Sequence, residues 1–280
     1  MQRFNTIYAT RQQLAPFRQS AQTIGLVPTM GALHEGHLDL IRRARQECDV
    51  VVASVFVNPT QFNNPDDLAR YPRTLEQDSE MLERVGTDIL FFPTVEEIYP
   101  EPTQLRLNFG KLETVMEGAS RPGHFNGVGI VVAKLFHSIQ PDRAYFGQKD
   151  LQQVAVIRRL IRDLSFPIEL VRCNTVRETD GLAMSSRNRN LSDSERQEAT
   201  RLYQALTLAH DLLIEGQSPS QAKAAVTGFF AQHPTFRLDY VEVANADSLQ
   251  PITELQAPGQ TAICLAAQLG KVRLIDNLVF

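Results

Sequence analysis

The apolar run at residues 50–57, which reads VVVASVFV, constrains the fold of this chain more than any other segment. It is rich in β-branched side chains and shows no alternation of polar and apolar residues. A strand that is buried on both faces has this composition, and such strands occur mainly in parallel sheets covered by helices on both sides. The run therefore predicts an α/β domain.

The segments around this run alternate between two patterns, which supports the same fold class. Strand-like segments lie at residues 24–27, 50–57, 87–92, 143–146 and 168–176, and helix-like segments lie at 38–44, 74–85, 129–139 and 151–164. We expect a Rossmann-like, doubly wound, mostly parallel sheet over residues 1–176. Ligands of such sheets bind beyond the carboxyl ends of the strands.

The pattern changes after residue 176. A long polar helix is expected at 195–215, a Gly-Gln-Ser-Pro break at 216–219, and a second helix reaching about residue 232. Three strand-like segments follow, at 236–244, 261–267 and 272–275. We expect residues 177–280 to form a smaller α+β domain that closes over the site of the first.

Composition excludes several classes of protein. The net charge of −4 and the pI of 5.9 argue against a general binder of nucleic acid or membrane surfaces. No apolar run approaches the roughly 20 residues of a membrane span, and the first residues lack the apolar core of a signal peptide. Cys48, Cys173 and Cys264 form no Cys-x-x-Cys pair, which makes a disulfide framework or a zinc site unexpected. A cytoplasmic protein is expected.

A glycine-bearing turn with two histidines follows the first predicted strand. His34 and His37 lie between the strand and a helix-like segment, with Gly36 between them. Backbone N–H groups and the positive end of the helix dipole converge at such a turn, which favours phosphate. Zinc-binding helices place their histidines four residues apart rather than three. The motif alone leaves phosphate, metal and no ligand open.

Other polar segments could complete a nucleotide site. Ser185, Ser186 and Arg187 could bind a polyphosphate through two hydroxyls and a guanidinium. Lys149 follows a predicted strand and could neutralise phosphate charge. The amides of Gln61 and Gln153 could orient a small polar substrate. Each is also compatible with an ordinary surface position, and no purpose is evident for the polar loop that contains Glu117, Arg121 and His124.

The combination is more specific than its parts. His34-x-Gly36-His37 followed by Met184-Ser185-Ser186-Arg187 resembles the paired signatures of the adenylyl-transferring superfamily that includes class I aminoacyl-tRNA synthetases. Within it, the chain resembles the pantothenate synthetase (pantoate–β-alanine ligase) family. The matching segments are residues 27–37, 57–62, 71–74, 117–125, 146–150, 180–188 and 273–277.

This resemblance implies an ATP-dependent ligation in two steps. The carboxylate of pantoate attacks the α-phosphate of ATP, which gives pantoyl adenylate and pyrophosphate. The amine of β-alanine then attacks the activated carbonyl, which gives pantothenate and AMP. The resemblance also implies ATP as cosubstrate, Mg²⁺ bound with it, and a homodimer, with no nucleic-acid or membrane partner.

The family pattern also implies roles for individual residues. His37, His34, Lys149 and Arg187 would be catalytic, Gln61 and Gln153 would bind pantoate, and Asp78 is a candidate contact for magnesium. Asp150 and Val176 would border the adenosine. The residues expected to contact ATP are Met30, Gly31, Ala32, Leu33, His34, Glu35, Gly36, His37, Gly147, Gln148, Lys149, Asp150, Val176, Met184, Ser185, Ser186 and Arg187.

One position departs from the family pattern, and two other functions remain alternatives. Gln148 occupies a position where the family often has an acid, and we expect Lys149 to keep its role beside it. The first alternative is a nucleotidyltransferase that acts on another small cofactor precursor. The second is a nucleotide-binding regulatory module without catalysis, which would bind ATP but would not exchange pyrophosphate.

Overall fold

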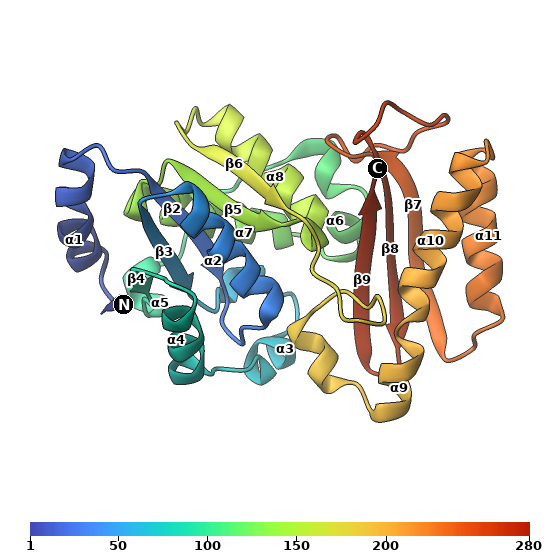
Figure 1. Cartoon of the computed structure of the whole chain (residues 1–280), viewed down its shortest axis with the longest axis horizontal. Helices are drawn as coiled ribbons and strands as arrows, with labels where there is room; N and C mark the ends of the chain where they lie inside the picture. Colours follow the sequence, from blue (N-terminus) through green and yellow to red (C-terminus); the bar gives the residue numbers. More distant parts are fainter.

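The computed structural model describes all residues, 1–280, and its larger sheet has six parallel strands (Figure 1). Their spatial order is β1 (Gln2–Phe4), β4 (Ile89–Phe91), β3 (Val50–Val55), β2 (Ile24–Thr29), β5 (Arg143–Gly147) and β6 (Glu169–Cys173). The predicted doubly wound α/β fold is confirmed.

Helices cover both faces of this sheet because its strands are apolar on both sides. On β2, Ile24 and Leu26 pack in a core with α1 (Ile7–Gln19), α7 (His124–Ile139) and α8 (Leu151–Asp163). Val27 points the other way, into a core with α2 (Glu35–Glu47) and α4 (Leu75–Arg84). The run at 50–57 divides its side chains between the same two cores, although its strand ends at Val55.

The order of the strands reverses between β2 and β5. From β2 the chain continues through β3 to β4 on one side, whereas β5 leads to β6 on the other. A crevice forms at the carboxyl ends of strands that diverge in this way, and it is the usual ligand site of open α/β sheets. Here it lies between the segments that follow β2 and β5.

Seven short helical elements between the longer ones were not predicted. They are η1 (Pro59–Gln61), α3 (Pro65–Arg70), α5 (Val95–Ile98), η2 (Gly110–Glu113), α6 (Met116–Ser120), η3 (Gln148–Asp150) and η4 (Ser186–Asn190). The three-residue strand β1 was also missed, and so was helix α1, although it has 13 residues. Elements of three to six residues carry too little periodicity to be identified from sequence.

A second, antiparallel sheet contains β7 (Phe236–Asn245), β8 (Thr261–Leu269) and β9 (Val272–Val279) in that order. Helices α10 (Arg201–Ile214) and α11 (Pro219–Ala231) pack on one face of it (Figure 1). Its other face packs against the larger unit, through Ala262 and Cys264 against Leu151 and Val156. The predicted α+β character of this region is confirmed.

The predicted single helix at 195–215 is wrong in one respect, because it is two helices. Helix α9 (Asp193–Glu198) begins with a capping box in which Ser192 and Glu195 exchange hydrogen bonds. The hydroxyl of Thr200 donates to the carbonyl oxygen of Gln197 (3.0 Å) at the turn before α10. Such side-chain hydrogen bonds compete with the helical pattern and favour a break.

Polar contacts also join the two units. The guanidinium of Arg273 on β9 donates to both carboxylate oxygens of Glu117 (2.7 and 2.9 Å), which is 8% exposed. Tyr240 donates to the same carboxylate (3.1 Å). These contacts hold β9 beside the crevice. No helix in the molecule combines the length and the hydropathy that crossing a bilayer requires.

Candidate active site

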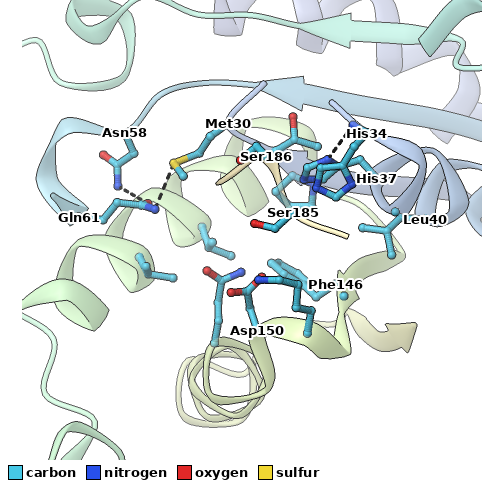
Figure 2. A pocket seen from close by; sticks show the side chains of 18 of the residues that line it. Met30, His34, His37, Leu40, Asn58, Gln61, Phe146, Asp150, Ser185 and Ser186 are labelled. Atoms are coloured by element: carbon cyan, nitrogen blue, oxygen red, sulfur yellow. Dashed lines mark hydrogen bonds between the residues drawn. The ribbon is translucent and has the colours of Figure 1, made fainter. Parts of the chain in front are cut away.

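A cavity of about 230 Å³ occupies the point where the strand order reverses. Figure 2 shows side chains from distant parts of the chain that face this space. His34 and His37 follow β2, Gln61 follows β3, and Asp150 follows β5. Ser185 joins them from the segment after β6.

The two histidine rings lie against each other at the start of α2, tilted by 40°. Their ring centroids lie 4.0 Å apart, and the backbone N–H of His34 donates to Nδ1 of His37 (3.4 Å). Because Nδ1 of His37 is an acceptor, we assign its proton to Nε2, where it can donate to a ligand. A Cβ on Gly36 would lie 3.0 Å from the His34 ring, which explains the glycine between the histidines.

Both histidines are uncharged at neutral pH. Burial lowers the pKa of His34 to about 4, with Lys149 and Arg189 contributing. Burial also lowers the pKa of His37 to about 3, with His34 as the next cause. Nδ1 of His34 is buried and has no hydrogen-bond partner. The pair therefore offers hydrogen-bonding groups to a ligand rather than positive charge.

Asp78 shapes the turn before these histidines. Gly31 and Ala32 both have positive φ (80° and 51°), so that successive backbone amides point to one side. The carboxylate of Asp78 accepts from the amides of Ala32 (3.0 Å) and Leu33 (2.8 Å), and from the hydroxyl of Thr74 (3.1 Å).

Two assignments made from the sequence change as a result. Both oxygens of Asp78 are occupied, and its side chain is only 1% exposed. This geometry does not support Asp78 as a magnesium contact, and no group of three or more His, Cys, Asp or Glu side chains is arranged to hold a metal. The backbone amides of Ala32 and Leu33 already donate to the carboxylate of Asp78 and are not available to ATP. A phosphate at this turn would instead be bound by the amides that follow Leu33 and by the histidines.

The second sheet fixes the turn that carries Lys149. The side-chain amide of Asn277 on β9 donates to the carbonyl oxygens of Gln148 and Lys149 (both 2.9 Å). Gln148 is buried, and its own amide donates to Oδ1 of Asn277 (3.4 Å). The neutral residue at position 148 is thus part of this contact, and Lys149 is free to face the cavity.

Asp150 stays ionised in the cavity. Burial alone would raise the pKa of this carboxyl, but Lys149, Arg187, His37 and Arg121 together hold it below its usual value. The site therefore carries an excess of positive charge, with one carboxylate among several cationic groups. This is the charge balance expected of a site for a polyanion.

The two signature segments meet although they are far apart in sequence. Arg189 donates to the carbonyl oxygen of Leu33 (3.1 Å), and a Cβ on Gly36 would lie 3.7 Å from Met184. Arg187 lines the cavity, and its closest acidic partner is Asp67, at 3.8 Å. An ion pair of this length between half-exposed side chains is weak, so the guanidinium is available to a ligand.

The opposite side of the cavity combines amides with apolar side chains. Asn58 donates to Oε1 of Gln61 (3.0 Å), and Nε2 of Gln61 lies 3.2 Å from the sulfur of Met30 (Figure 2). Gln153 lines the same cavity from α8. The apolar side chains beside them are Val128, Val131, Val132 and Leu135 of α7.

Most of the predicted site residues line this cavity. They are Met30, His34, Gly36, His37, Gln61, Gly147, Lys149, Asp150, Gln153, Val176, Met184, Ser185, Ser186 and Arg187. Gly31, Ala32, Leu33, Glu35, Gln148 and Asp78 do not line it. Four further lining residues were given no role from the sequence: Asn58, Tyr71, Asn174 and Thr175. Asn58 and Tyr71 lie in segments that match the family, whereas Asn174 and Thr175 gave no signal.

Comparison with known proteins identifies the family. The family model for pantoate–β-alanine ligase matches residues 2–279. The chain belongs to the pantoate–β-alanine ligase family. A pantothenate synthetase of Moorella thermoacetica is 50% identical over 280 residues, which cover this whole chain and 98% of the relative.

Two solved structures of the family support this. A pantothenate synthetase from Thermus thermophilus has 46% identity and a TM-score of 0.93, covering all of this chain and 99% of the other. A Francisella tularensis pantoate–β-alanine ligase was solved in complex with beta-gamma ATP and β-alanine. It has 36% identity and a TM-score of 0.79, and the match covers 100% of this chain and 97% of the other.

We predict that Asn277→Asp slows ATP–pyrophosphate exchange by about tenfold or more, because two hydrogen bonds are lost and a carboxylate faces two carbonyl oxygens. Asn245→Asp at the end of β7 is the matched control, since Oδ1 of Asn245 already accepts two backbone amides. We expect the control to exchange at the wild-type rate. An equally active Asn277→Asp protein would contradict the role of Asn277.

We also predict acid destabilisation through His124. Burial, followed by Arg121, lowers the pKa of His124 to about 4, so the unfolded state binds more protons between pH 6.5 and 4. Stability is therefore full above pH 6.5 and is lost as pH falls through this window. Between pH 7.5 and 5 we expect the free energy of unfolding to fall by about 2 kcal/mol through His124 alone. In urea unfolding, the drop in unfolding free energy between pH 7.5 and 5 should be smaller by that amount in His124→Gln than in the wild type. An equal drop in both proteins would contradict this assignment.

Proposed function

We propose that this protein joins pantoate to β-alanine at the expense of ATP, forming pantothenate, AMP and pyrophosphate through pantoyl adenylate. The observation that carries the proposal is the meeting of the two signature segments in one cavity. His34, His37, Lys149 and Arg187 face this cavity together with Gln61 and Gln153. Groups suited to phosphates therefore lie beside groups suited to a small hydroxy acid.

In the first step, a carboxylate oxygen of pantoate bonds to the α-phosphorus of ATP, and the bond to the β,γ-pyrophosphate breaks. Negative charge grows on the departing oxygens, so fixed cations and donors should supply most of the stabilisation. Lys149 and Arg187 supply positive charge. Nε2–H of His37 and the hydroxyls of Ser185 and Ser186 supply hydrogen bonds.

Pantoate recognition uses the opposite side of the cavity. Its two hydroxyl groups suit the amides of Gln61 and Gln153, and its two methyl groups suit the apolar side chains of α7. Two hydrogen bonds hold Gln61 in place. The side-chain amide of Asn58 donates to Oε1 of Gln61 (3.0 Å), and the ring of His124 donates from Nδ1 to the backbone carbonyl oxygen of Gln61 (2.9 Å). The acid is thereby oriented before the reaction, which lowers the entropic part of the barrier.

In the second step, the neutral amine of β-alanine attacks the carbonyl carbon of pantoyl adenylate. The bond from that carbon to the AMP oxygen breaks, AMP leaves, and the amine loses a proton as the amide forms. Burial of the adenylate protects it from hydrolysis, provided that the cavity closes over it. We propose that the smaller domain, residues 177–280, provides this closure over residues 1–176.

Magnesium would reach the site bound to ATP. The side chains present do not form a metal site of their own, but a hard cation bridging phosphate oxygens needs few protein carboxylates. We therefore write Mg·ATP as the substrate and assign no step to a protein-bound metal. We also propose that the protein is a cytoplasmic homodimer, as the family resemblance implies.

The direct test is release of pyrophosphate from ATP and magnesium, with pantoate and β-alanine added singly and together. Steady formation of AMP and pyrophosphate only when both acids are present supports the ligase. Turnover without pantoate would favour the nucleotidyltransferase. ATP binding without pyrophosphate exchange would favour the regulatory module.

We predict that Arg187→Ala slows formation of the adenylate by about 100-fold or more, because it removes a cation from the developing phosphate charge. Aminolysis of preformed pantoyl adenylate should slow far less, since pyrophosphate has already left. Arg187→Lys keeps the charge and should recover part of the rate. Equal slowing of both half-reactions in rapid-quench measurements would contradict this division of roles.

A further inference from the structure

Arg121 lies beside the active site but has no role in the mechanism above. It follows α6, in the loop whose purpose the sequence left open, and it lines the main cavity. It also lines a second, smaller cavity of about 40 Å³, whose other lining residues include Tyr240, Cys264 and Asn277 of the small sheet. The two cavities share Arg121, His124, Lys149, Asp150 and Gln153 as lining residues.

The hydrogen bonds of Arg121 are made to neutral groups. Its Nη1 donates to Nε2 of His124 (3.1 Å), and its Nη2 lies 3.4 Å from the carbonyl oxygen of Gln61. His124 donates from Nδ1 to that same carbonyl oxygen (2.9 Å). His124 is therefore the neutral tautomer with Nε2 as acceptor, and it does not balance the charge of the guanidinium.

Two of the acids nearby are already paired with other arginines, and the third, Asp150, interacts mainly with Lys149 and Arg187. Glu117 forms a two-point ion pair with Arg273, and Asp276 forms one with Arg177 (2.6 and 3.1 Å). Burial lowers the pKa of Arg121, which reflects the cost of a cation in this position. Arg121 is only partly exposed and forms no ion pair of its own. A cation in such a position is costly without an anionic partner, so an anionic ligand at this point would be favoured.

The second cavity lacks the groups expected to hold phosphate. No residue of the turn at 30–37 or of the loop at 184–187 lines it. Its space corresponds to about three water-sized groups, which suits the end of a short acid rather than a triphosphate. Its walls include Phe125 and Leu151, which suit a methylene chain.

We propose that Arg121 binds the carboxylate of the amine substrate, holding it at the junction of the two cavities while its amine end reaches the activated carbonyl. This rests on the proposed ligase function and deepens it. The carboxylate of pantoate is consumed in the adenylate, whereas the carboxylate of the amino acid takes no part in the bonds that form. This second carboxylate is still negatively charged when the amino acid binds, and Arg121 favours amines that carry it over amines that do not.

The proposal is tested with Arg121→Ala, Arg121→Lys and, as a matched control, Arg162→Ala at an exposed position of α8. Pantoate-dependent ATP–pyrophosphate exchange measures adenylation alone. AMP formation is then compared for β-alanine and for n-propylamine, which keeps the amine and the three-carbon chain but lacks the carboxylate.

For Arg121→Ala we expect kcat/KM for β-alanine to fall by about 10- to 100-fold, the range for a hydrogen bond between charged groups. Exchange and the reaction with propylamine should stay within about threefold of wild type, so that the preference for β-alanine collapses. Arg121→Lys should keep part of the preference, and Arg162→Ala all of it.

Three outcomes would overturn the proposal. Loss of exchange would place Arg121 at the phosphates, a raised KM for pantoate would place it at the first acid, and equal loss with both amines would make it merely structural. A wild-type protein without pantoate-dependent exchange would instead refute the proposed function. A preference for β-alanine that is unchanged in Arg121→Ala would be a fourth outcome that overturns the inference, and it would leave the proposed function standing.

Discussion

The parallel pairing of β2 with β5 is the contact on which the active site depends. Gly25 is aligned with Arg143 and Leu26 with Ala144, although more than 100 residues separate these strands. Because both strands run in the same direction, their carboxyl ends reach the same edge of the sheet. The histidines that follow β2 and the lysine that follows β5 therefore face one cavity. The relative positions of these catalytic candidates therefore depend on the register of β2 and β5.

The loops at this edge are held from outside the sheet. Asp78 of α4 anchors the turn before the histidines, and Asn277 of β9 anchors the turn before Lys149. Arg189 joins the downstream loop to Leu33. Each anchor satisfies backbone groups that would otherwise be unpaired in a buried place, where an unmade hydrogen bond is costly. The small sheet thus contributes to the active site by fixing the turn that carries Lys149.

Much of the fold was predictable because its long elements have strong patterns. The apolar run at 50–57 and the amphipathic helix at 151–164 can be identified from their own residues, because burial on two faces or on one face determines which residue types occur in them. The break between α9 and α10 was missed because it depends on a local hydrogen bond, from the hydroxyl of Thr200 to the carbonyl oxygen of Gln197. Three-residue β1 was missed because pairing with β4, not local periodicity, defines it.

The family signatures placed His34, His37, Lys149 and Arg187 in one predicted site, and the structure brings these four side chains to the lining of one cavity. The role of Asp78 was not predictable, because a carboxylate that binds metal and one that binds backbone amides look alike in sequence. Only the left-handed turn at Gly31 and Ala32 distinguishes them. The network of Arg121, His124 and Gln61 was likewise hidden, since its partners lie about 60 residues apart and meet only in the folded chain.

The central claim is that the carboxylate of pantoate attacks the α-phosphate of ATP in this cavity. Pantoate labelled with ¹⁸O in both carboxylate oxygens, incubated with ATP, magnesium and β-alanine, tests it directly by mass spectrometry of the products. The account predicts one labelled oxygen in AMP and the other in the amide carbonyl of pantothenate. Unlabelled AMP, or label in inorganic phosphate released together with ADP, would contradict it.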